Sequence, residues 1–152
     1  MFYGTSRHTL DDKKRIHLPA RLLESIAQVD WKFTLTVGLD GCLFLFDQAG
    51  WKRLVETCQG DQIGGPELRA LQRAFFSNVV TVVPDGQRRM VIPDELAARV
   101  QLGKDVVVVG AHNRIEIWPG PRWDEYQKAN QDQFELFANQ ILSGTLSRKL
   151  SS

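Results

Sequence analysis

Long apolar segments are absent from this sequence of 152 residues. No apolar run approaches the length needed to cross a membrane, and the longest are short valine-rich stretches such as Val106 to Val109. The N-terminal residues also lack the long apolar region of a signal peptide. A soluble, cytoplasmic protein is therefore expected, and 43% apolar residues suffice for one ordinary domain or two very small ones.

Cysteine is scarce, which removes several classes of site. Cys42 lies in the apolar run from Cys42 to Phe46, and Cys58 lies near the end of an expected helix, with no metal-type spacing around either residue. Buried structural thiols are favoured over a disulfide or a zinc site. No metal and no cofactor are expected.

A strong charge of one sign is also missing, because the net charge is only +1. Bulk electrostatics therefore neither supports nor excludes a nucleic-acid partner. The local distribution is uneven, with cations gathered at three places: Arg7, Lys13, Lys14, Arg15 and Arg21; Arg88 and Arg89; and Arg148 with Lys149.

What the sequence does contain is an internal duplication. The nonapeptides Asp11 to Pro19 and Asp85 to Pro93 each have an Asp, an Arg four residues later, an apolar-x-apolar step and a Pro, at an offset of 74 (85 minus 11). A two-residue indel between Pro19 and Gly38 would explain why later matches fall at an offset of 72. The further matches are Phe2 with Phe76 at 74, and Gly38 with Gly110, Phe46 with Trp118 and Trp51 with Trp123 at 72.

Each repeat begins with an expected hairpin. Ile16 and Leu18, like Met90 and Ile92, alternate with residues of other character, which is the period of a strand with one buried face. The preceding segments, Arg7 to Leu10 and Val79 to Val83, also have strand character. We therefore predict that each motif is a hairpin whose loop is the four residues after the Asp.

Short helices and a second hairpin follow in each repeat. Pro19 and Pro93 suit the first turn of a helix. The second hairpins are expected at Lys32 to Val37 with Cys42 to Phe46, and at Val106 to Val109 with Arg114 to Trp118, each followed by a helix near Trp51 or Trp123. These expectations divide the chain into a first repeat (1–58), a linker and bridging helix (59–74), a second repeat (75–126) and a helical tail (127–152).

Two segments are expected to be irregular. Gln59 to Pro66 contains three Gly and a Pro and is predicted to be a flexible joint. In the tail, Phe134, Phe137 and Ile141 have helical spacing, whereas the chain from Ser143 onward is predicted to be disordered.

The combination of motifs resembles the MraZ family over residues 1 to 126. The resemblance rests on Met1-Phe2-x-Gly4, His8-Thr9-Leu10-Asp11, both Asp-x-x-x-Arg motifs, Gly38 to Leu43, Phe75-Phe76-Ser77, and Ile115 to Trp118 with Trp123. It implies an α+β fold related to the AbrB-like swapped-hairpin proteins: a β-rich, intertwined double-split barrel of two tandem pseudo-symmetric repeats with short covering helices. It also implies that copies associate into a closed ring.

The resemblance further implies a function. MraZ-like proteins are bacterial transcriptional regulators, associated with the nucleoid, that bind G-rich direct repeats in the promoter of the division and cell-wall gene cluster that includes their own gene. The family's contacts to double-stranded DNA map to the loops that are Asp11 to Arg15 and Asp85 to Arg89 here. The DNA-binding candidates are therefore Lys13, Lys14, Arg15, Arg88 and Arg89.

The chemistry of these residues agrees with that role. An Arg at a hairpin tip can enter the major groove and donate two hydrogen bonds to O6 and N7 of guanine. Asp11 and Asp85 would organise the loops, by accepting backbone N–H bonds or by bracing the Arg side chain. In the alternative interpretation, Asp and Arg only staple the hairpin and do not touch DNA.

This sequence departs from the family at one position in each loop. The residue before the motif Arg is usually Gly in the family, but it is Lys14 in the first loop and Arg88 in the second. If the Gly serves a positive-φ turn, these residues are strained there; if it does not, each adds a cation at the tip. Lys13-Lys14-Arg15 is more basic than Gln87-Arg88-Arg89, so the first loop is expected to dominate the affinity.

Other functions have less support. His8, His17 and His112 have no nucleophile elbow, phosphate-binding loop or metal-spaced cluster around them, so neither an enzyme nor a small-molecule substrate is expected. The Trp residues could stack on bases, but Trp51 and Trp123 occupy equivalent repeat positions, which favours core or subunit packing. The remaining alternative is a structural ring or protein-interaction module that does not read DNA.

Overall fold

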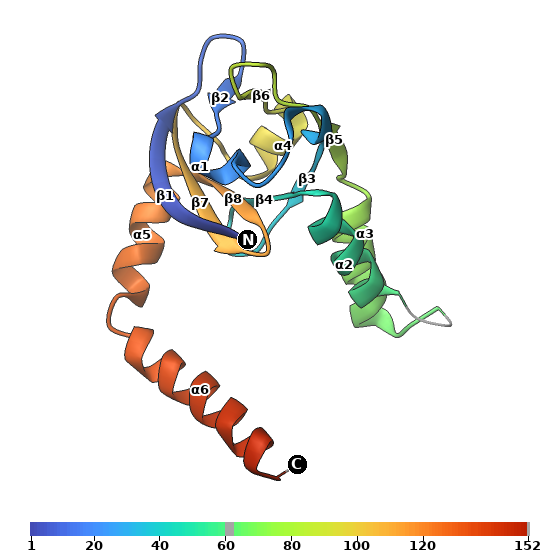
Figure 1. The fold of residues 1–152 in the computed structure, drawn as a ribbon, viewed down its shortest axis with the longest axis vertical. Coiled ribbons are helices and arrows are strands. Elements are labelled where there is room, and N and C mark those ends of the chain that lie inside the picture. The colour runs from blue at the N-terminus through green and yellow to red at the C-terminus, as the bar shows by residue number, and fades with distance from the viewer. Residues whose placement is uncertain (60–62, 152) are drawn as a thin grey trace. The chain divides into compact units, whose positions relative to one another are not determined.

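The computed structural model describes residues 1–59 and 63–151, with side chains described up to residue 144. It divides into two compact units, Met1–Gly120 and Pro121–Ser152. The strands of the first unit are β1 (Phe2–Thr9), β2 (Arg15–His17), β3 (Phe33–Val37), β4 (Leu43–Phe46), β5 (Val80–Val82), β6 (Arg89–Val91), β7 (Asp105–His112) and β8 (Ile115–Pro119) (Figure 1). Its helices are α1 (Ala20–Leu23), the 3-10 turn η1 (Gln28–Asp30), α2 (Gln48–Cys58), α3 (Pro66–Phe76) and α4 (Asp94–Arg99). Part of the segment predicted to be a flexible joint, residues 60–62, lies outside the described residues.

The two repeats are intertwined in one antiparallel sheet. The strand order is β1-β7-β8-β4-β3-β5, and β2 pairs with β6 in a separate two-stranded ribbon. Strands of the first repeat therefore lie next to strands of the second at β1–β7, β8–β4, β3–β5 and β2–β6. The α+β class and the tandem, interleaved architecture are confirmed. The expected barrel is not closed, because no pairing joins the edge strands β1 and β5 in the described part of the chain.

The predicted first hairpins are wrong in their strand partners. β1 pairs with β7 rather than β2, and β5 pairs with β3 rather than β6. The apolar alternation identifies a strand with one buried face but cannot identify the strand opposite, and the duplicated motif offers an equally good partner. The second hairpins are confirmed, since β3 pairs with β4 and β7 with β8.

The strand pairings obey a local twofold symmetry. In the ribbon, Ile16 lies opposite Met90, its own counterpart at an offset of 74 (90 minus 16). In the sheet, Phe44 lies opposite Glu116, its own counterpart at an offset of 72 (116 minus 44). Both pairs therefore lie on the symmetry axis that relates the repeats.

The pairings also correct the predicted indel. Arg7 lies opposite Val107, and the equivalent pair in the other half is Thr81 with Thr34. In this equivalence Arg7 corresponds to Thr81 at an offset of 74 (81 minus 7), and Thr34 corresponds to Val107 at an offset of 73 (107 minus 34). Because the offset falls to 73 at β3 and to 72 at β4, the repeats differ by two single-residue indels, not by one two-residue indel.

A single apolar core joins the ribbon, the sheet and the short helices. Ile16 of β2 and Met90 of β6 are 1% and 0% exposed and pack in the same cluster as Leu35 and Ile117 of the sheet. The helices α1 and α4 begin near Pro19 and Pro93, but each Pro is the N-cap before the helix and not a first-turn residue as predicted. Each helix contributes two residues to this cluster. These residues are Leu22, Leu23, Leu96 and Ala97.

Aromatic side chains of α2 and α3 pack against each other and against the sheet. The ring of Trp51 lies 5.9 Å from that of Phe46 and 5.5 Å from that of Phe76. Trp51 is thus part of the packing between α2, α3 and β4, as predicted. Cys42 and Cys58 are buried free thiols, which confirms their predicted structural role, and burial raises the pKa of the Cys42 thiol.

The second unit holds α6 (Phe134–Ser151) and, apart from its first residue, α5 (Gly120–Asn130). The helix α6 continues to Ser151, whereas disorder was predicted from Ser143 onward. Several large apolar side chains of α6 are exposed: Phe134, Leu136, Phe137 and Leu142. No helix in the described part of the chain combines the length and hydropathy needed to cross a bilayer.

Candidate nucleic-acid interface

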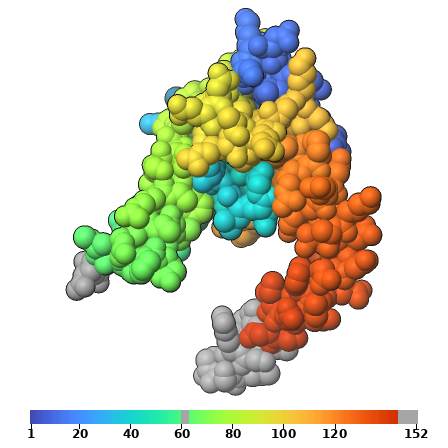
Figure 2. All heavy atoms as spheres, turned by 180° about the vertical axis from the view of Figure 1, so that it is seen from behind, coloured from blue at the N-terminus to red at the C-terminus, as the bar shows by residue number. Residues whose placement is uncertain are grey.

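The two Asp-x-x-x-Arg loops lie side by side at one end of the first unit. We call Asp11–Arg15 loop 1 and Asp85–Arg89 loop 2. Each loop leads directly into a strand of the ribbon, so the β2–β6 pairing brings them together (Figure 1). Figure 2 shows, from the opposite side, the first motif (blue) next to the second half of the chain (yellow). All the predicted DNA-binding residues therefore gather at this end: Lys13, Lys14, Arg15, Arg88 and Arg89.

Loop 1 is a compact turn organised by one carboxylate. Oδ1 of Asp11 accepts hydrogen bonds from the backbone N–H of Lys13 at 2.9 Å and of Arg15 at 2.8 Å. Oδ2 accepts from Nε of Arg15 at 2.8 Å. The backbone N–H of Asp11 donates to the carbonyl of Arg15 at 3.0 Å and closes the turn. Asp11 therefore both orders the backbone and braces the Arg side chain.

Loop 2 repeats this geometry. Oδ1 of Asp85 accepts from the backbone N–H of Gln87 and of Arg89, both at 2.9 Å. Oδ2 accepts from Nε of Arg89 at 2.8 Å. Sequences that differ at the inner loop positions thus adopt the same hydrogen-bond pattern, because the Asp and the Arg, which make these bonds, are shared.

The same bonds keep both carboxylates ionised. The backbone N–H of Arg15 is the largest cause that lowers the pKa of Asp11, and the guanidinium of Arg15 adds to it. The backbone N–H of Arg89 likewise lowers the pKa of Asp85. Each Arg therefore has its charge partly balanced at Nε, while its two terminal NH2 groups make no bond to the described residues.

The residue before each Arg adopts a positive φ. Lys14 and Arg88 both have a φ of 61°, in the left-handed region that favours glycine. The family Gly at this position was predicted either to serve a positive-φ turn or to be replaced without strain. The structure supports the first interpretation, in which Lys14 and Arg88 are strained. The same two residues also bond to the other repeat. The carbonyl of Lys14 accepts a hydrogen bond from the N–H of Ile92 at 2.9 Å, and the carbonyl of Arg88 accepts one from the N–H of Leu18 at 2.8 Å.

The cations of the two loops differ in availability. Lys13 is exposed, and the side chain of Lys14 is 56% exposed with its Nζ 3.9 Å from a carboxylate oxygen of Asp94. Arg88 instead folds back, and its Nε donates to the carbonyl of Leu18 at 3.3 Å. Arg15 and Arg89 are 23% and 27% exposed at the side chain. Loop 1 therefore presents two exposed lysines, whereas Arg88 of loop 2 is partly buried and bonded to the backbone.

Two neighbours of the loops were not identified from the sequence. The backbone N–H of Leu10 donates to the carbonyl of Lys104 at 2.8 Å, which places Lys104 beside loop 1. Nε2 of Gln28 lies 3.5 Å from the position that a Cβ would occupy on Gly86 of loop 2. Both contacts join segments far apart in the chain, so no local pattern could have revealed them.

The histidines form no comparable site. Nε2 of His8 lies 2.7 Å from Oγ of Ser6, and burial, followed by the charges of His17 and Arg21, lowers the pKa of His8. His17 is exposed on β2, and His112 ends β7 with a positive φ. Within the described residues, no group of three or more His, Cys, Asp or Glu side chains could hold a metal ion.

Comparison with known proteins agrees with the duplicated architecture. A family model described as "MraZ protein, putative antitoxin-like" matches residues 1–74 and again residues 75–142. The chain belongs to the MraZ family. The resemblance found in the sequence is thereby confirmed, and each MraZ match contains one Asp-x-x-x-Arg loop.

The relatives match over nearly their whole length. A transcriptional regulator MraZ from Moorella thermoacetica is 38% identical over 142 residues, which cover 93% of this chain and 97% of the relative. A transcriptional regulator MraZ from Heliobacterium modesticaldum is 39% identical over 142 residues, with the same coverage of each chain. The match therefore extends through both loops, the ribbon and the start of α6.

Proposed function

We propose that this MraZ-family chain is a transcriptional regulator that binds double-stranded DNA through loops 1 and 2. The observation that carries the proposal is the pair of Asp-braced arginines, Arg15 and Arg89, which the β2–β6 ribbon brings to one end of the first unit. The names of the relatives as transcriptional regulators support the same role. We assign no catalytic role to His8, His17 or His112.

The geometry suits guanine recognition. With Nε of Arg15 held by Asp11, the terminal NH2 groups remain as donors for O6 and N7 of a guanine. Because the carboxylate already restricts the side chain, less conformational entropy is lost when the arginine binds a base. Each such contact discriminates against a wrong base by about 1 to 3 kcal/mol.

The proposed target is a set of G-rich direct repeats in the promoter of the division and cell-wall gene cluster, including the gene for this chain. Direct repeats suit a protein whose copies are arranged head to tail, because neighbouring copies then present their loops in the same orientation. Binding there would make the chain a nucleoid-associated protein of the cytoplasm.

A ring of copies would compensate for the small charge of one chain. The net charge is only +1, so a single pair of loops offers few phosphate contacts. Linked weak sites gain affinity through effective concentration. The exposed apolar residues of α6, Phe134, Phe137 and Leu142, support self-association, because side chains of this kind are enriched at subunit interfaces.

A titration of the full-length chain with its own upstream DNA tests the proposal. We expect tight binding to a duplex with the tandem G-rich repeats, and weak, uniform binding when the guanines are replaced. The variant Arg15→Ala with Arg89→Ala should lose this preference, while Lys52→Ala on α2 should retain it. Failure of the intact oligomer to prefer the repeats would instead favour the alternative, a structural ring or protein-interaction module.

A further inference from the structure

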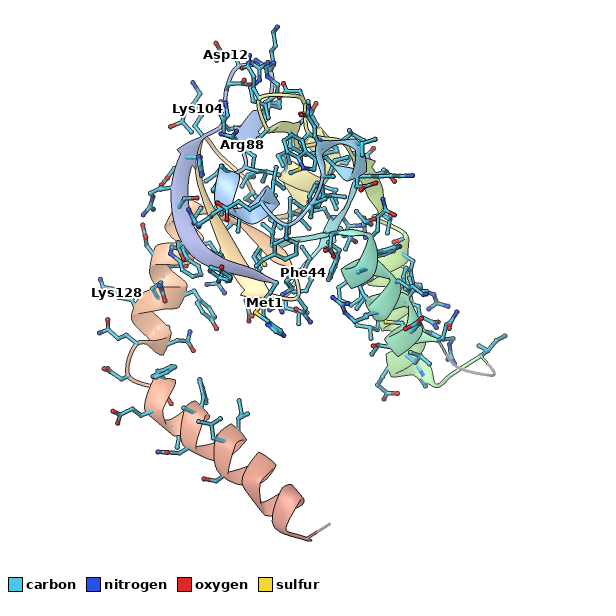
Figure 3. All side chains as sticks on the ribbon, in the orientation of Figure 1. Met1, Asp12, Phe44, Arg88, Lys104 and Lys128 are labelled. Atoms are coloured by element: carbon cyan, nitrogen blue, oxygen red, sulfur yellow. The ribbon has the colours of Figure 1, made fainter. Side chains whose placement is uncertain are left out.

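We propose that Lys104 contacts a DNA phosphate next to the site of loop 1 and makes the loop 1 side the stronger anchor on the duplex. This inference rests on the proposed DNA-binding function. Leu10, directly before loop 1, donates its backbone N–H to the carbonyl of Lys104 at 2.8 Å. Figure 3 places Lys104 at the same end of the first unit as Asp12 of loop 1 and Arg88 of loop 2 (Figure 3).

The ammonium group of Lys104 is available for a ligand. The residue is exposed, and it makes no ion pair with the described part of the chain. Its neighbour Asp105 is already engaged, because Nε and Nη2 of Arg7 donate to its two carboxylate oxygens at 2.9 and 3.1 Å. The nearest carboxylate in sequence is therefore neutralised by another residue.

Beside loop 2, the position equivalent to Lys104 is not a cation. The counterpart of Leu10 is Pro84 (84 minus 10 is 74), which has no N–H to donate. The strands β3 and β7 correspond at an offset of 73, so the counterpart of Lys104 is Trp31 (104 minus 31 is 73). Nε1 of Trp31 donates to the carbonyl of Ile26 at 3.0 Å. One polar side chain beside loop 2 is the neutral amide of Gln28, whose Nε2 lies 3.5 Å from the position of a Cβ on Gly86.

The chemistry of Lys104 points to phosphate rather than to a base. A flexible ammonium group acts as a point charge, whereas base recognition favours the planar, braced fork of an arginine such as Arg15. Loop 1 would then read the base while Lys104 fixes the register of the backbone. Each phosphate that is neutralised releases counterions, so its contribution appears in the salt dependence of binding.

Fluorescence anisotropy of the full-length protein with a labelled duplex of its upstream repeats, at several salt concentrations, tests the inference. Log K falls as log salt rises, and in Lys104→Ala the magnitude of this slope should be smaller by about 0.9 for each copy bound. The wild-type affinity should therefore fall about 3.5-fold more per copy between 50 and 200 mM salt than that of the variant. The preference for guanine should be unchanged, and Lys52→Ala on α2 serves as the matched control.

A reciprocal variant tests the asymmetry. Gln28→Lys places a cation beside loop 2 and should make the salt dependence steeper, by about 0.9 in the magnitude of the slope per copy. An unchanged slope in Lys104→Ala, with normal wild-type binding and an unchanged unfolding curve, overturns the inference and leaves the proposed function standing. A wild-type protein that binds neither specific nor random duplex overturns both.

Discussion

Ile16 lies directly opposite Met90 in the β2–β6 ribbon, and the two residues occupy the same position in the two repeats. Both side chains are almost completely buried, at 1% and 0% exposure. The ribbon therefore couples the two loops to each other and to the common core. Each loop is therefore also held by the other repeat, through the bonds of Ile92 to Lys14 and of Leu18 to Arg88.

Truncation of Ile16 should destabilise both repeats together. Ile16→Ala removes one methylene and two methyl groups from the core and is expected to cost about 2 to 5 kcal/mol of the free energy of unfolding. Urea denaturation followed by fluorescence should show one transition at lower urea for the first unit. The control His17→Ala, at an exposed position of the same strand, should change stability by less than about 0.5 kcal/mol. Separate transitions for the two repeats would contradict the coupling.

Asp11→Asn should weaken DNA binding while the fold stays intact. The amide has one acceptor oxygen, so it cannot hold both the backbone N–H groups and Nε of Arg15 as the carboxylate does. Affinity for the repeats is expected to fall roughly tenfold, the scale of one guanine contact. Asp12→Asn, at the exposed neighbour, should bind equally well or better. Unchanged affinity in Asp11→Asn would instead support the interpretation that Asp and Arg only staple the turn.

Lys14→Gly should relieve backbone strain. Lys14 has a φ of 61°, and glycine adopts this conformation without the clash of a Cβ. Because glycine also loses more entropy on folding, we expect a net stabilisation of at most about 1 kcal/mol, seen as a higher Tm. Lys13→Gly, at a position without positive φ, should lower the Tm. A lower Tm for both variants would show that strain at Lys14 is negligible.

The loops should lose stability in acid. The pKa values of Asp11 and Asp85 are lowered in the folded state, so the unfolded state takes up protons first as pH falls. Their stabilising contribution is complete above the ordinary pKa of 3.8 and is lost as pH falls through the lower folded value. Denaturation between about pH 2 and 6 should show this loss, and a variant with both Asp residues changed to Asn should show a smaller one, because the Arg7 guanidinium still lowers the pKa of Asp105. An equal acid dependence in that variant would assign the effect to other carboxylates.

Phe137→Glu should reduce self-association. Phe137 is 45% exposed on α6, and a carboxylate there is costly to bury in a subunit interface. Light scattering after gel filtration should show a smaller assembly, and this variant should bind tandem repeats poorly, because linked sites are lost. Asn139→Glu introduces the same charge at another exposed position and should leave the assembly unchanged. Full-strength binding by a proven monomer would refute the role of the ring.

Local interactions made much of the candidate site predictable. Asp11 and Arg15 are four residues apart in one turn, so their possible bonds could be anticipated from the sequence, as could those of Asp85 and Arg89. Lys104 could not be anticipated, because it lies 94 residues from Leu10 (104 minus 10) and meets loop 1 only through the β1–β7 pairing. The turn of each loop could therefore be predicted from the sequence, whereas the residues from distant segments that lie beside it could not.

The amino-acid sequence by itself determined the duplication, the strand periodicity, the presence of helices next to Pro19 and Pro93, and the two loops. Only the tertiary structure decided that β2 pairs with β6, that Lys14 and Arg88 adopt positive φ, and that the sheet remains open. The physical reason is that apolar alternation specifies which face of a strand is buried but not which strand lies opposite. In a duplicated chain the competing partners carry the same pattern, so packing of the whole core makes the choice.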